Sequence, residues 1–334
     1  MPISSPPSPR RLCVAPMMER TDRHFRFLLR LISRHVYLYT EMVTSQALLH
    51  GDHAALLRFH NHEHPLGVQV GGDEPRTLAA CARMAVDAGY DEINLNVGCP
   101  SERVQAGRFG ACLMLEPVRV AECVAAMTQA VPVPVTVKTR LGVDNRDSYE
   151  LLRDFVARVA DAGCRSFIVH ARKAWLKGLS PRENREVPPL DYDRVARLKD
   201  DFPQLEIILN GGITTLPQAA GFIPAVDGVM IGRAVYDNPY MLADADRDFY
   251  ADDRQLSGRE AVLRDMFPYI EAELSAGARL NSITRHLLNL YHGMPGARAW
   301  RRALSENAHR PGAGIEVLER ALCRMDALVP GRAA

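Results

Sequence analysis

Eight short β-like runs alternate with helical patterns between residues 12 and 231, and this repetition predicts an α/β architecture with a parallel sheet. The runs are mostly rich in Val, Ile and Leu, as expected of strands buried on both faces. They are Leu12–Ala15, Val36–Tyr39, Leu66–Val70, Glu92–Asn96, Val135–Thr139, Ser166–Val169, Glu206–Leu209 and Gly228–Ile231. Eight βα units predict a closed (β/α)8 barrel, the TIM barrel. A doubly wound sheet is the alternative, but no Gly-x-Gly-x-x-Gly motif follows the first run.

Amphipathic stretches of helical period lie between the runs. The clearest are Pro75–Ala88, Pro117–Ala130, Ser148–Ala162 and Leu216–Phe222. Gly89 and Gly163 each stand just before a β-like run, where a glycine that caps the end of a helix is expected. The order strand, helix, strand is therefore kept through the first two thirds of the chain.

After about residue 250 the β signals stop, and a small all-α helical bundle is expected. Its helical segments lie near 259–276, 279–290, 296–307 and 313–328, after a polar linker at Asp244–Gly258. The expected domains are a flexible tail at 1–10, a barrel at 11–245 and a helical domain at 246–334. A barrel of roughly 250 residues leaves room for such an addition.

Composition narrows the class of protein. The chain has 334 residues, 47% hydrophobic and 24% charged, which is typical of a globular protein. No apolar run approaches the ~20 residues of a membrane span, and the Pro- and Ser-rich start lacks a signal-peptide core. Seven cysteines without a Cys-x-x-Cys pair favour reduced thiols and a cytoplasmic location. The net charge of +1 gives no global sign of nucleic-acid binding.

The ends of the last two runs carry the residues of a phosphate site. Asn210, Gly211 and Gly212 follow the seventh run, and Gly232 and Arg233 follow the eighth. Glycine lets backbone amides approach an anion, and arginine can add a bidentate contact. In TIM barrels function gathers at the carboxyl ends of the strands, so a phosphorylated ligand is expected there. The motif does not identify that ligand.

Lys138, at the end of the fifth run, has three interpretations. It could pair with a carboxylate, form a Schiff base, or place positive charge beside a flavin ring. Gln69 and His170 end the third and sixth runs and supply further polar groups at the same edge. Together with the phosphate site, these residues favour a flavin, although each alone is weak support.

Cys99 is the sharpest feature, because it lies in a turn directly after the fourth run. A thiol at a barrel mouth can act as a nucleophile or as a proton donor. A donor needs no dedicated base, since an ordinary thiol is mostly protonated at neutral pH. The other cysteines are expected to be small buried hydrophobic residues. They are Cys13, Cys81, Cys112, Cys123, Cys164 and Cys323.

These motifs together resemble the tRNA-dihydrouridine synthases. The stretch Leu95–Pro100, followed by Gly110 and Met114, is similar to the active-site segment of that family. Further similar segments follow in the family's order: Ala15–Met18 with Thr21 and Asp22, Lys138–Arg140, His170–Arg172, Asn210–Gly212 and Gly228–Arg233. The bacterial A subfamily is resembled at Thr40–Met42, Lys173–Ser180, Asn184–Glu186 and Pro188–Tyr192. The resemblance covers nearly the whole chain.

The resemblance implies a mechanism and a cofactor. NADPH reduces FMN, the reduced flavin delivers hydride to C6 of a uridine, and Cys99 donates the proton to C5. The subfamily acts on D-loop positions 20 and 20a. The residues that carry over as FMN contacts are Pro16, Met17, Met18, Gln69, Lys138, His170, Asn210, Gly211, Gly212, Gly232 and Arg233.

A uridine in folded tRNA must leave its stack to reach a barrel mouth, and basic groups on the phosphate backbone must offset that cost. Asn96 and Arg172 are the candidates for the base itself. The loop after the sixth run offers Lys177 and Arg185, with Glu183 and Glu186 among them. In the helical domain, spacing puts three arginines on one helical face: Arg298, Arg301 and Arg302.

Three other functions would each explain only part of the sequence. A flavin barrel that reduces a small pyrimidine would not need the helical domain or the long loop after the sixth run. A Schiff-base lyase would lack flavin absorption, and a tRNA-binding protein without catalysis would not need Cys99. His60, His62 and His64, with His53 nearby, could suggest a metal, but they precede the third run, at the wrong end of the barrel. We therefore expect no metal, no protein partner and a monomer.

Overall fold

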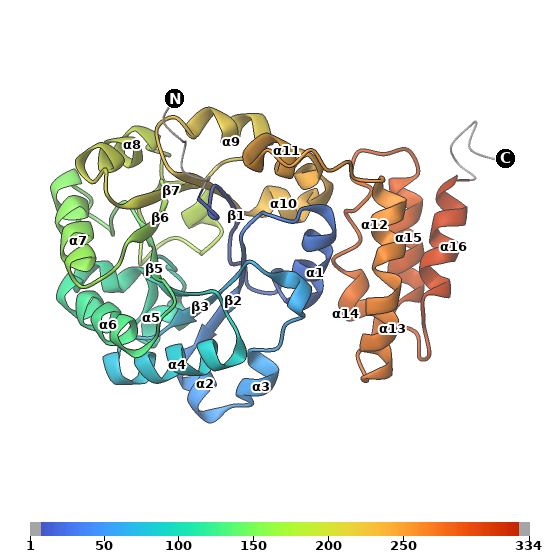
Figure 1. Cartoon of the computed structure of the whole chain (residues 1–334), viewed down its shortest axis with the longest axis horizontal. Coiled ribbons are helices and arrows are strands. Elements are labelled where there is room, and N and C mark those ends of the chain that lie inside the picture. The colour runs from blue at the N-terminus through green and yellow to red at the C-terminus, as the bar shows by residue number, and fades with distance from the viewer. Residues whose placement is uncertain (1–7, 327–334) are drawn as a thin grey trace. The chain divides into compact units, whose positions relative to one another are not determined.

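The computed structural model describes residues 8–326, and its first feature is a barrel of eight parallel strands (Figure 1). The strands are β1 Leu12–Val14, β2 Leu38–Thr44, β3 Leu66–Gly71, β4 Glu92–Asn96, β5 Val135–Arg140, β6 Ser166–His170, β7 Glu206–Asn210 and β8 Gly228–Ile231. They pair in the order β1-β8-β7-β6-β5-β4-β3-β2. A parallel bridge between Cys13 and Tyr37 joins the two ends of that order and closes the barrel. The predicted TIM barrel is confirmed.

Only β2 departs clearly from its predicted range. It begins at Leu38 and continues to Thr44, whereas the apolar run ends at Tyr39. The register with β3 shifts between Tyr39 and Met42, so the strand contains an irregularity. Thr40 and Glu41 are polar, so a pattern based on apolar residues ends the strand before them. The strand continues because its backbone groups pair with β3 again from Met42 onward.

Helices of the first unit follow the predicted pattern, and several match to the residue. They are α2 Ser45–His50, α3 His53–Leu56, α4 Pro75–Ala88, α5 Glu102–Ala106, α6 Pro117–Ala130, α7 Tyr149–Asp161, α8 Tyr192–Asp201 and α9 Leu216–Phe222, with short 3-10 turns at Asn61–Glu63, Gly110–Leu115 and Glu183–Arg185. Ser148 caps α7 by accepting a hydrogen bond from Leu151 N. Gly89 ends α4 with a φ of 101°, a left-handed conformation that glycine adopts without strain.

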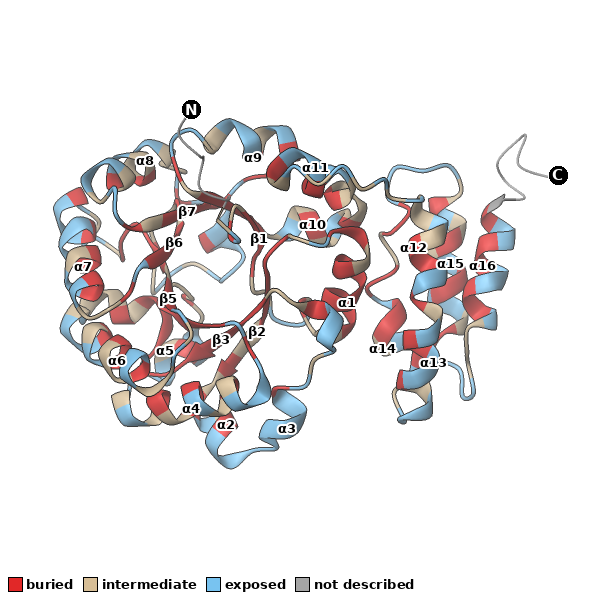
Figure 2. Cartoon of the chain, viewed as in Figure 1, coloured by how far each residue is buried: buried red, intermediate tan, exposed pale blue. Residues whose placement is uncertain are grey.

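Burial follows the barrel architecture (Figure 2). The strands are almost wholly buried, while the helices around them bury one side only. The predicted flexible tail, residues 1–10, lies largely outside the described residues. The prediction is wrong for its last residue, Arg10. The Arg10 side chain is buried and pairs with Glu92 and Glu206 at the amino end of the barrel. We call these three residues the floor cluster.

Internal contacts divide the chain into two units. One holds Val36–Gly232 with the chain before His24, and the other holds His24–His35 with the chain after Gly232. The second unit contains α1 Arg23–Ile32 from its second residue onward, together with α10 Arg233–Asp237, a 3-10 turn Pro239–Asp244, α11 Ala245–Tyr250, α12 Arg259–Asp265, α13 Phe267–Ser275, α14 Leu280–Thr284, α15 Ala297–Asn307 and α16 Glu316–Asp326. The predicted domain boundary at residue 245 falls inside this unit and stays a prediction.

The second unit is helical as expected, but its segments differ in detail. The predicted helix at 259–276 is two helices, because Pro268 has no N–H to continue the first one. The segment at 279–290 is helical only to Thr284, and the indole of Trp300 donates to the Leu287 carbonyl beyond it. The predicted polar linker contains α11, and the end of the predicted segment 313–328 lies outside the described residues. None of the helices in residues 8–326 could span a membrane.

Candidate active site

Strand register brings polar side chains of neighbouring strands together toward the carboxyl end of the barrel, here called the mouth. The aligned pairs run from β3 to β7: Gln69 with Asn94, Asn96 with Lys138, Arg140 with His170, and His170 with Asn210. Because alternate residues of a strand point to one face, the barrel interior receives these side chains from neighbouring strands. Five strands thus contribute to a single polar surface.

The barrel below that surface is filled by side chains. A buried cluster occupies it: Cys13, Ala15, Tyr37, Tyr39, Ile168, Ile208 and Met230. Met17, from the loop after β1, packs against this cluster and is only partly buried. The mouth therefore has an apolar base with a methionine on it, while the neighbouring Met18 side chain is 59% exposed.

Cys99 lies in the turn after β4, and Asn96 holds that turn. The Asn96 Oδ1 atom accepts hydrogen bonds from Gly98 N at 3.1 Å and from Cys99 N at 3.0 Å. The Cys99 thiol is half-buried, with its Sγ 3.6 Å from Ser101 Oγ. Ser101 in turn caps α5 through Val104 N. The turn therefore offers an accessible thiol in a fixed position.

The other six cysteines test the prediction of buried residues. Burial is confirmed for four of them: Cys13, Cys81, Cys123 and Cys164. Cys112 is half-buried. The prediction is wrong for Cys323, which is exposed on α16, because Leu322 and Met325 belong to the buried stripe of that helix and Cys323 lies on the opposite face.

A cluster of cationic groups lies at the β5–β6 side of the mouth. Burial, and then the Arg140 guanidinium, lower the pKa of Lys138 to about 7. Burial also lowers the pKa of His170 well below its usual value, with contributions from Arg140, Lys138, Arg172 and Arg185. For Arg140 itself, burial lowers the pKa to about 10. Such a site favours an anionic ligand, which would offset the repulsion.

Arg140 also ties three segments together. Its guanidinium donates to the carbonyl of Gly98 at 2.9 Å, in the Cys99 turn. It also donates to Lys173 O at 3.1 Å and to Asn184 O at 2.9 Å, both in the loop after β6. Sequence reasoning placed Arg140 at a strand end but gave it no role. The signal in the sequence is an arginine at the end of a largely apolar run, because a charged side chain placed there needs partners inside the protein.

A second set of contacts orders the loop after β6. Asn184 is fully buried and exchanges hydrogen bonds with the Trp175 backbone, accepting from its N at 2.7 Å and donating to its O at 2.9 Å. Gln105, on α5, donates to Pro100 O and to Leu176 O, both at 2.8 Å. Gln105 and Arg140 thus link the Cys99 turn to this loop from two sides.

Two glycines of the predicted phosphate site have a left-handed backbone. Gly211 and Gly212 have φ values of 116° and 68°, which other residues rarely adopt. A Cβ on Gly211 would lie 2.6 Å from His170 Cδ2, so a larger residue would collide with the site. At Gly232 an added Cβ would be in ordinary contact with Ala15 Cβ at 3.6 Å, so this position does not sterically require glycine. The left-handed glycines after β7 are the part of the site whose backbone amides can turn toward a phosphate group.

The sequence of this chain matches the model of a known protein family. The family model described as dihydrouridine synthase matches residues 13–325, which is most of the chain. The chain belongs to the dihydrouridine synthase family. The resemblance expected from the sequence motifs is therefore confirmed, and the matched range includes the Cys99 turn, the strand ends and the glycine turns.

Individual members of the family are similar over nearly their full length. A protein of Shewanella oneidensis named tRNA-dihydrouridine(20/20a) synthase is 59% identical over 310 residues, covering 93% of this chain and 92% of that protein. Proteins of the same name from Synechocystis sp. and Escherichia coli K12 are 58% and 56% identical. Those two matches cover 93% of this chain and 93% and 90% of the relatives.

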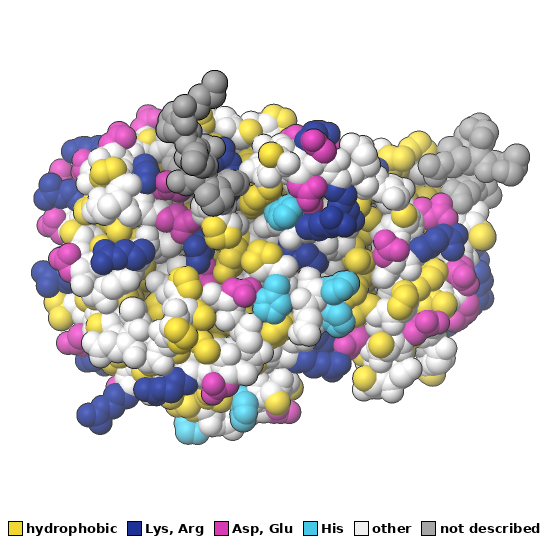
Figure 3. Space-filling model, in the orientation of Figure 1, with side chains coloured by type: hydrophobic (Ala, Val, Ile, Leu, Met, Phe, Trp, Pro, Cys, Tyr) yellow, Lys and Arg dark blue, Asp and Glu magenta, His cyan; other side chains and the backbone are white. Residues whose placement is uncertain are grey.

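The candidate tRNA contacts of this family member lie in two places. In the loop after β6, Lys177 and Arg185 are exposed, Glu183 accepts from Ser180, and Glu186 pairs with Arg182 at 3.6 Å. Glu183 and Glu186 therefore already have partners within the loop. On α15, Trp300 is buried while two of the predicted arginines, Arg298 and Arg302, are exposed and the third, Arg301, is half-buried. Basic and acidic side chains are interspersed over the face drawn in Figure 3.

The histidines before β3 have structural contacts. His60 accepts from His62 N at 3.1 Å, and His64 Nδ1 lies 2.6 Å from Asp91 Oδ2. Within residues 8–326, the one group with metal-like spacing is His35, Asp246 and Asp252. Asp246 already accepts from Ser33 Oγ and from two backbone N–H groups at the end of α1. Its oxygens hold that helix end, so the group gives no argument for a metal.

Proposed function

We propose that this chain is a tRNA-dihydrouridine synthase that reduces the C5=C6 bond of uridines at D-loop positions 20 and 20a. The observation that carries the proposal is the Cys99 turn, held at the barrel mouth beside the polar side chains of β3 to β7. The names of the similar proteins give the substrate and the positions. The proposal rests on both, since the mouth alone would suit several flavin reductases.

We infer that the mouth holds FMN. The chemistry of the residues fits: the glycines after β7 and β8, with Asn210 and Arg233, would hold the phosphate, as predicted. Gln69, Lys138 and His170 would contact the flavin ring, with Pro16, Met17 and Met18 on the side of the first loop. When bound, the flavin supplies the hydride that goes to C6 of the uracil.

The cationic cluster prepares the mouth for that ligand. With a pKa near 7, Lys138 is only partly charged at neutral pH before an anion is present. An anionic group beside it would favour the charged form, so ligand binding takes up a proton. Burial and the same neighbouring cations lower the pKa of His170, which favours its neutral form in the ligand-free mouth.

Cys99 supplies the proton of the reaction. Its S–H bond breaks as a C–H bond forms at C5 of the uracil, and the thiol is left as a thiolate. The Ser101 hydroxyl, 3.6 Å from Sγ, can hold that thiolate by a hydrogen bond until solvent returns a proton. The turn matters because general acid catalysis requires the proton within hydrogen-bond reach of the acceptor atom.

The base must be presented by tRNA in a flipped-out conformation. Asn96 uses its Oδ1 on the Cys99 turn and one Nδ2 hydrogen on Gln69, so its second Nδ2 hydrogen is left for a carbonyl of the uracil. Arg172 is the second candidate for the base. Lys177 and Arg185 would contact tRNA phosphates from the loop after β6, and the arginines of α15 would do so from the helical domain.

The remaining elements of the proposal follow from the reaction. We assign to NADPH the role of the reductant that would supply the electrons for each turnover. Because tRNA is the substrate, the enzyme acts in the cytoplasm, and we propose a monomer that needs no protein partner. The purified enzyme tests the choice of reductant and the oligomeric state.

A deletion strain tests the function. Dihydrouridine at positions 20 and 20a is measured by mass spectrometry in tRNA from cells lacking this gene, then after rescue with wild type, Cys99→Ala or Cys323→Ala. The proposal predicts rescue by wild type and by Cys323→Ala, which removes an exposed thiol far along the sequence, but not by Cys99→Ala. Dihydrouridine that persists unchanged in the deletion strain, with no second synthase present, would overturn the proposal.

A further inference from the structure

Polar side chains occupy every second position of β4, in the interior of the barrel. Glu92, Asn94 and Asn96 are exposed by 0%, 0% and 8%, so all three are buried. Period-two spacing puts them on one face of the strand, with Glu92 toward the floor and Asn96 at the mouth. Buried polar groups are costly unless each is hydrogen-bonded, so each of these side chains is expected to have a partner.

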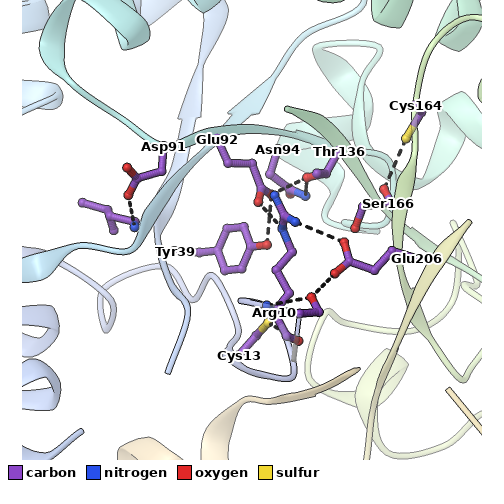
Figure 4. Close-up of polar contacts among 12 residues, drawn as sticks. Arg10, Cys13, Tyr39, Asp91, Glu92, Asn94, Thr136, Cys164, Ser166 and Glu206 are labelled. Atoms are coloured by element: carbon purple, nitrogen blue, oxygen red, sulfur yellow. Dashed lines mark hydrogen bonds and ion pairs between the residues drawn. The ribbon is translucent and has the colours of Figure 1, made fainter. Parts of the chain in front are cut away.

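The floor half of this row surrounds one carboxylate (Figure 4). Arg10 Nε lies 2.5 Å from Glu92 Oε2, and the Tyr39 hydroxyl donates to Glu92 Oε1 at 2.9 Å. The Thr136 hydroxyl, on β5, also donates to Glu92 Oε1. Thr136 Oγ1 in turn accepts from Asn94 Nδ2 at 2.8 Å.

The mouth half continues the same chain. Gln69 donates from Nε2 to Asn94 Oδ1 at 2.8 Å, and Asn96 donates from Nδ2 to Gln69 Oε1 at 2.8 Å. Asn96 Oδ1 then accepts from the backbone N–H groups of Gly98 and Cys99. An unbroken series of hydrogen bonds therefore runs through the barrel from Glu92 to the Cys99 turn.

Both ends of this series have a fixed polarity. A carboxylate paired with arginine can only accept, so Thr136 must donate to Glu92 and accept from Asn94. At the other end, backbone N–H groups can only donate, so Asn96 must turn its Oδ1 toward Cys99. The ends demand the same direction, and every amide between them has a single orientation that satisfies its neighbours.

We propose that Glu92 and Thr136 are positioning residues for the proton-donating turn, acting through the ordered amides of Asn94, Gln69 and Asn96. The inference rests on the proposed function, because it takes Cys99 as the acid. The carboxylate and hydroxyl near the floor set the direction of the series, and the series holds the Asn96 oxygen against the backbone of Cys99. A misplacement of about 1 Å at a reacting group can lower a rate by about 100-fold, so remote orientation matters.

The series transmits orientation rather than protons. Three consecutive amides separate Thr136 from the turn, and a neutral amide holds its N–H protons at the pH of a cell. The rival reading is a purely structural one, in which the polar row only stabilises the barrel. The two readings differ in what happens when one link is cut: orientation predicts a catalytic loss in folded enzyme, and structure alone predicts a stability loss.

The test cuts the series at Thr136 in the full-length, flavin-loaded enzyme. Thr136→Val keeps the shape but removes donor and acceptor, Thr136→Ser keeps the hydroxyl, and Ser166→Ala removes a buried hydroxyl of β6 that has no hydrogen-bond partner in the described residues. Dihydrouridine formation gives kcat and KM for tRNA. The alkylation rate of the Cys99 peptide, measured by mass spectrometry, reports on the turn itself.

We expect Thr136→Val to lower kcat by at least about tenfold, or about 1.4 kcal/mol, with KM for tRNA unchanged and the Cys99 alkylation rate altered. Thr136→Ser should restore both values, and Ser166→Ala should match wild type. If Thr136→Val is not recovered folded, Glu92→Gln replaces it. Its amide can donate as well as accept, so the direction of the series is no longer fixed and kcat should again fall.

A folded Thr136→Val enzyme with wild-type kcat and a wild-type alkylation rate would overturn the inference, even if its melting temperature fell. The same result in Glu92→Gln would do so where that variant decides. Failure of the proposed function is distinguishable, because the wild-type enzyme itself would then form no dihydrouridine in the same assay.

Discussion

The floor and the mouth of the barrel both bury charged side chains, but they balance them differently. At the floor, Arg10 pairs with Glu92 at 2.5 Å and with Glu206 at 3.1 Å. Burial opposes the charge of Arg10, yet Glu92 and the other acidic groups outweigh it and raise the pKa of Arg10. The buried charges of the floor are therefore compensated within the protein, and removing one partner would leave the other charge buried and unpaired.

At the mouth, the charges face groups of the same sign. The pKa values of Lys138, Arg140 and His170 all move down, and nearby arginines contribute to each shift. Buried repulsion of this kind costs folding free energy, and it is relieved when an anion enters. Buried charge is therefore balanced by protein groups at the amino end of the strands, whereas at the carboxyl end it stays unbalanced until an anion binds.

The largest expected effect is at the floor. Arg10→Met leaves Glu92 buried without its cation, so the free energy of unfolding should fall by about 3–5 kcal/mol. Urea unfolding of the ligand-free protein measures it. The control is Arg302→Met, which breaks an exposed ion pair with Glu306 and should change the unfolding midpoint little. An unchanged midpoint for Arg10→Met would show that the floor cluster is not what stabilises the barrel.

The same kind of substitution at the mouth should have the opposite sign. Lys138→Met removes a cation that has lost much of its charge to burial and to Arg140, so the ligand-free protein should gain on the order of 2 kcal/mol. The variant should also bind FMN more weakly. A loss of stability in the ligand-free state would contradict the account of an uncompensated mouth.

Flavin affinity should depend on pH through Lys138. In the ligand-free folded protein its pKa is about 7 instead of the usual 10.5. Between these values the unfolded chain holds a proton that the folded chain lacks, so this group makes the ligand-free protein more stable as pH rises. Binding an anion restores the proton, so the Kd for FMN should rise by up to about tenfold per pH unit above 7.

Fluorescence quenching of FMN, titrated at several values between pH 7 and 9, measures this dependence. Lys138→Met is the matched control, and its Kd should stay flat over the same range. A steep dependence that survives in Lys138→Met would assign the proton to another group.

The smallest expected effect is in the barrel wall. Ser166 Oγ is buried without a hydrogen-bond partner in the described residues, so Ser166→Ala removes an unsatisfied group and should stabilise by about 0–1 kcal/mol. Thermal unfolding measures it beside the floor and mouth variants. A clear loss of stability would show that this hydroxyl makes a favourable interaction in the folded protein and would contradict the prediction.

The sequence predicts the barrel well because its signals are periodic. Short runs rich in Val, Ile and Leu recur between amphipathic stretches, and α4, α6 and α9 begin and end where the pattern does. Prediction fails where one residue decides the outcome. Pro268 splits a helix that the apolar period alone would continue. The helix α11 lies in a stretch that looks like a polar linker. Its Asp246 is held by partners more than two hundred positions earlier in the chain, and a local sequence pattern cannot show such contacts.

The site divides in the same way. Function in TIM barrels gathers at the carboxyl ends of the strands, and the sequence shows Lys138, His170 and Cys99 at such ends. The strand register then brings the strand-end residues together. The Arg140 links and the series from Glu92 to Cys99 depend on side chains meeting across strands, which no local pattern encodes. The period-two polar row of β4 was nevertheless visible in the sequence, and it is the signal to look for in other barrel strands.

The most direct test of the central claim is a single turnover of the purified enzyme. Its flavin is reduced with NADPH and mixed anaerobically with tRNA that lacks dihydrouridine, and flavin oxidation and dihydrouridine are followed together. The account predicts that wild type forms one dihydrouridine per flavin oxidised, while Cys99→Ala retains reduced flavin and forms almost none. Equal rates in both enzymes would contradict the role of Cys99, and a reduced flavin that never reacts with tRNA would contradict the function itself.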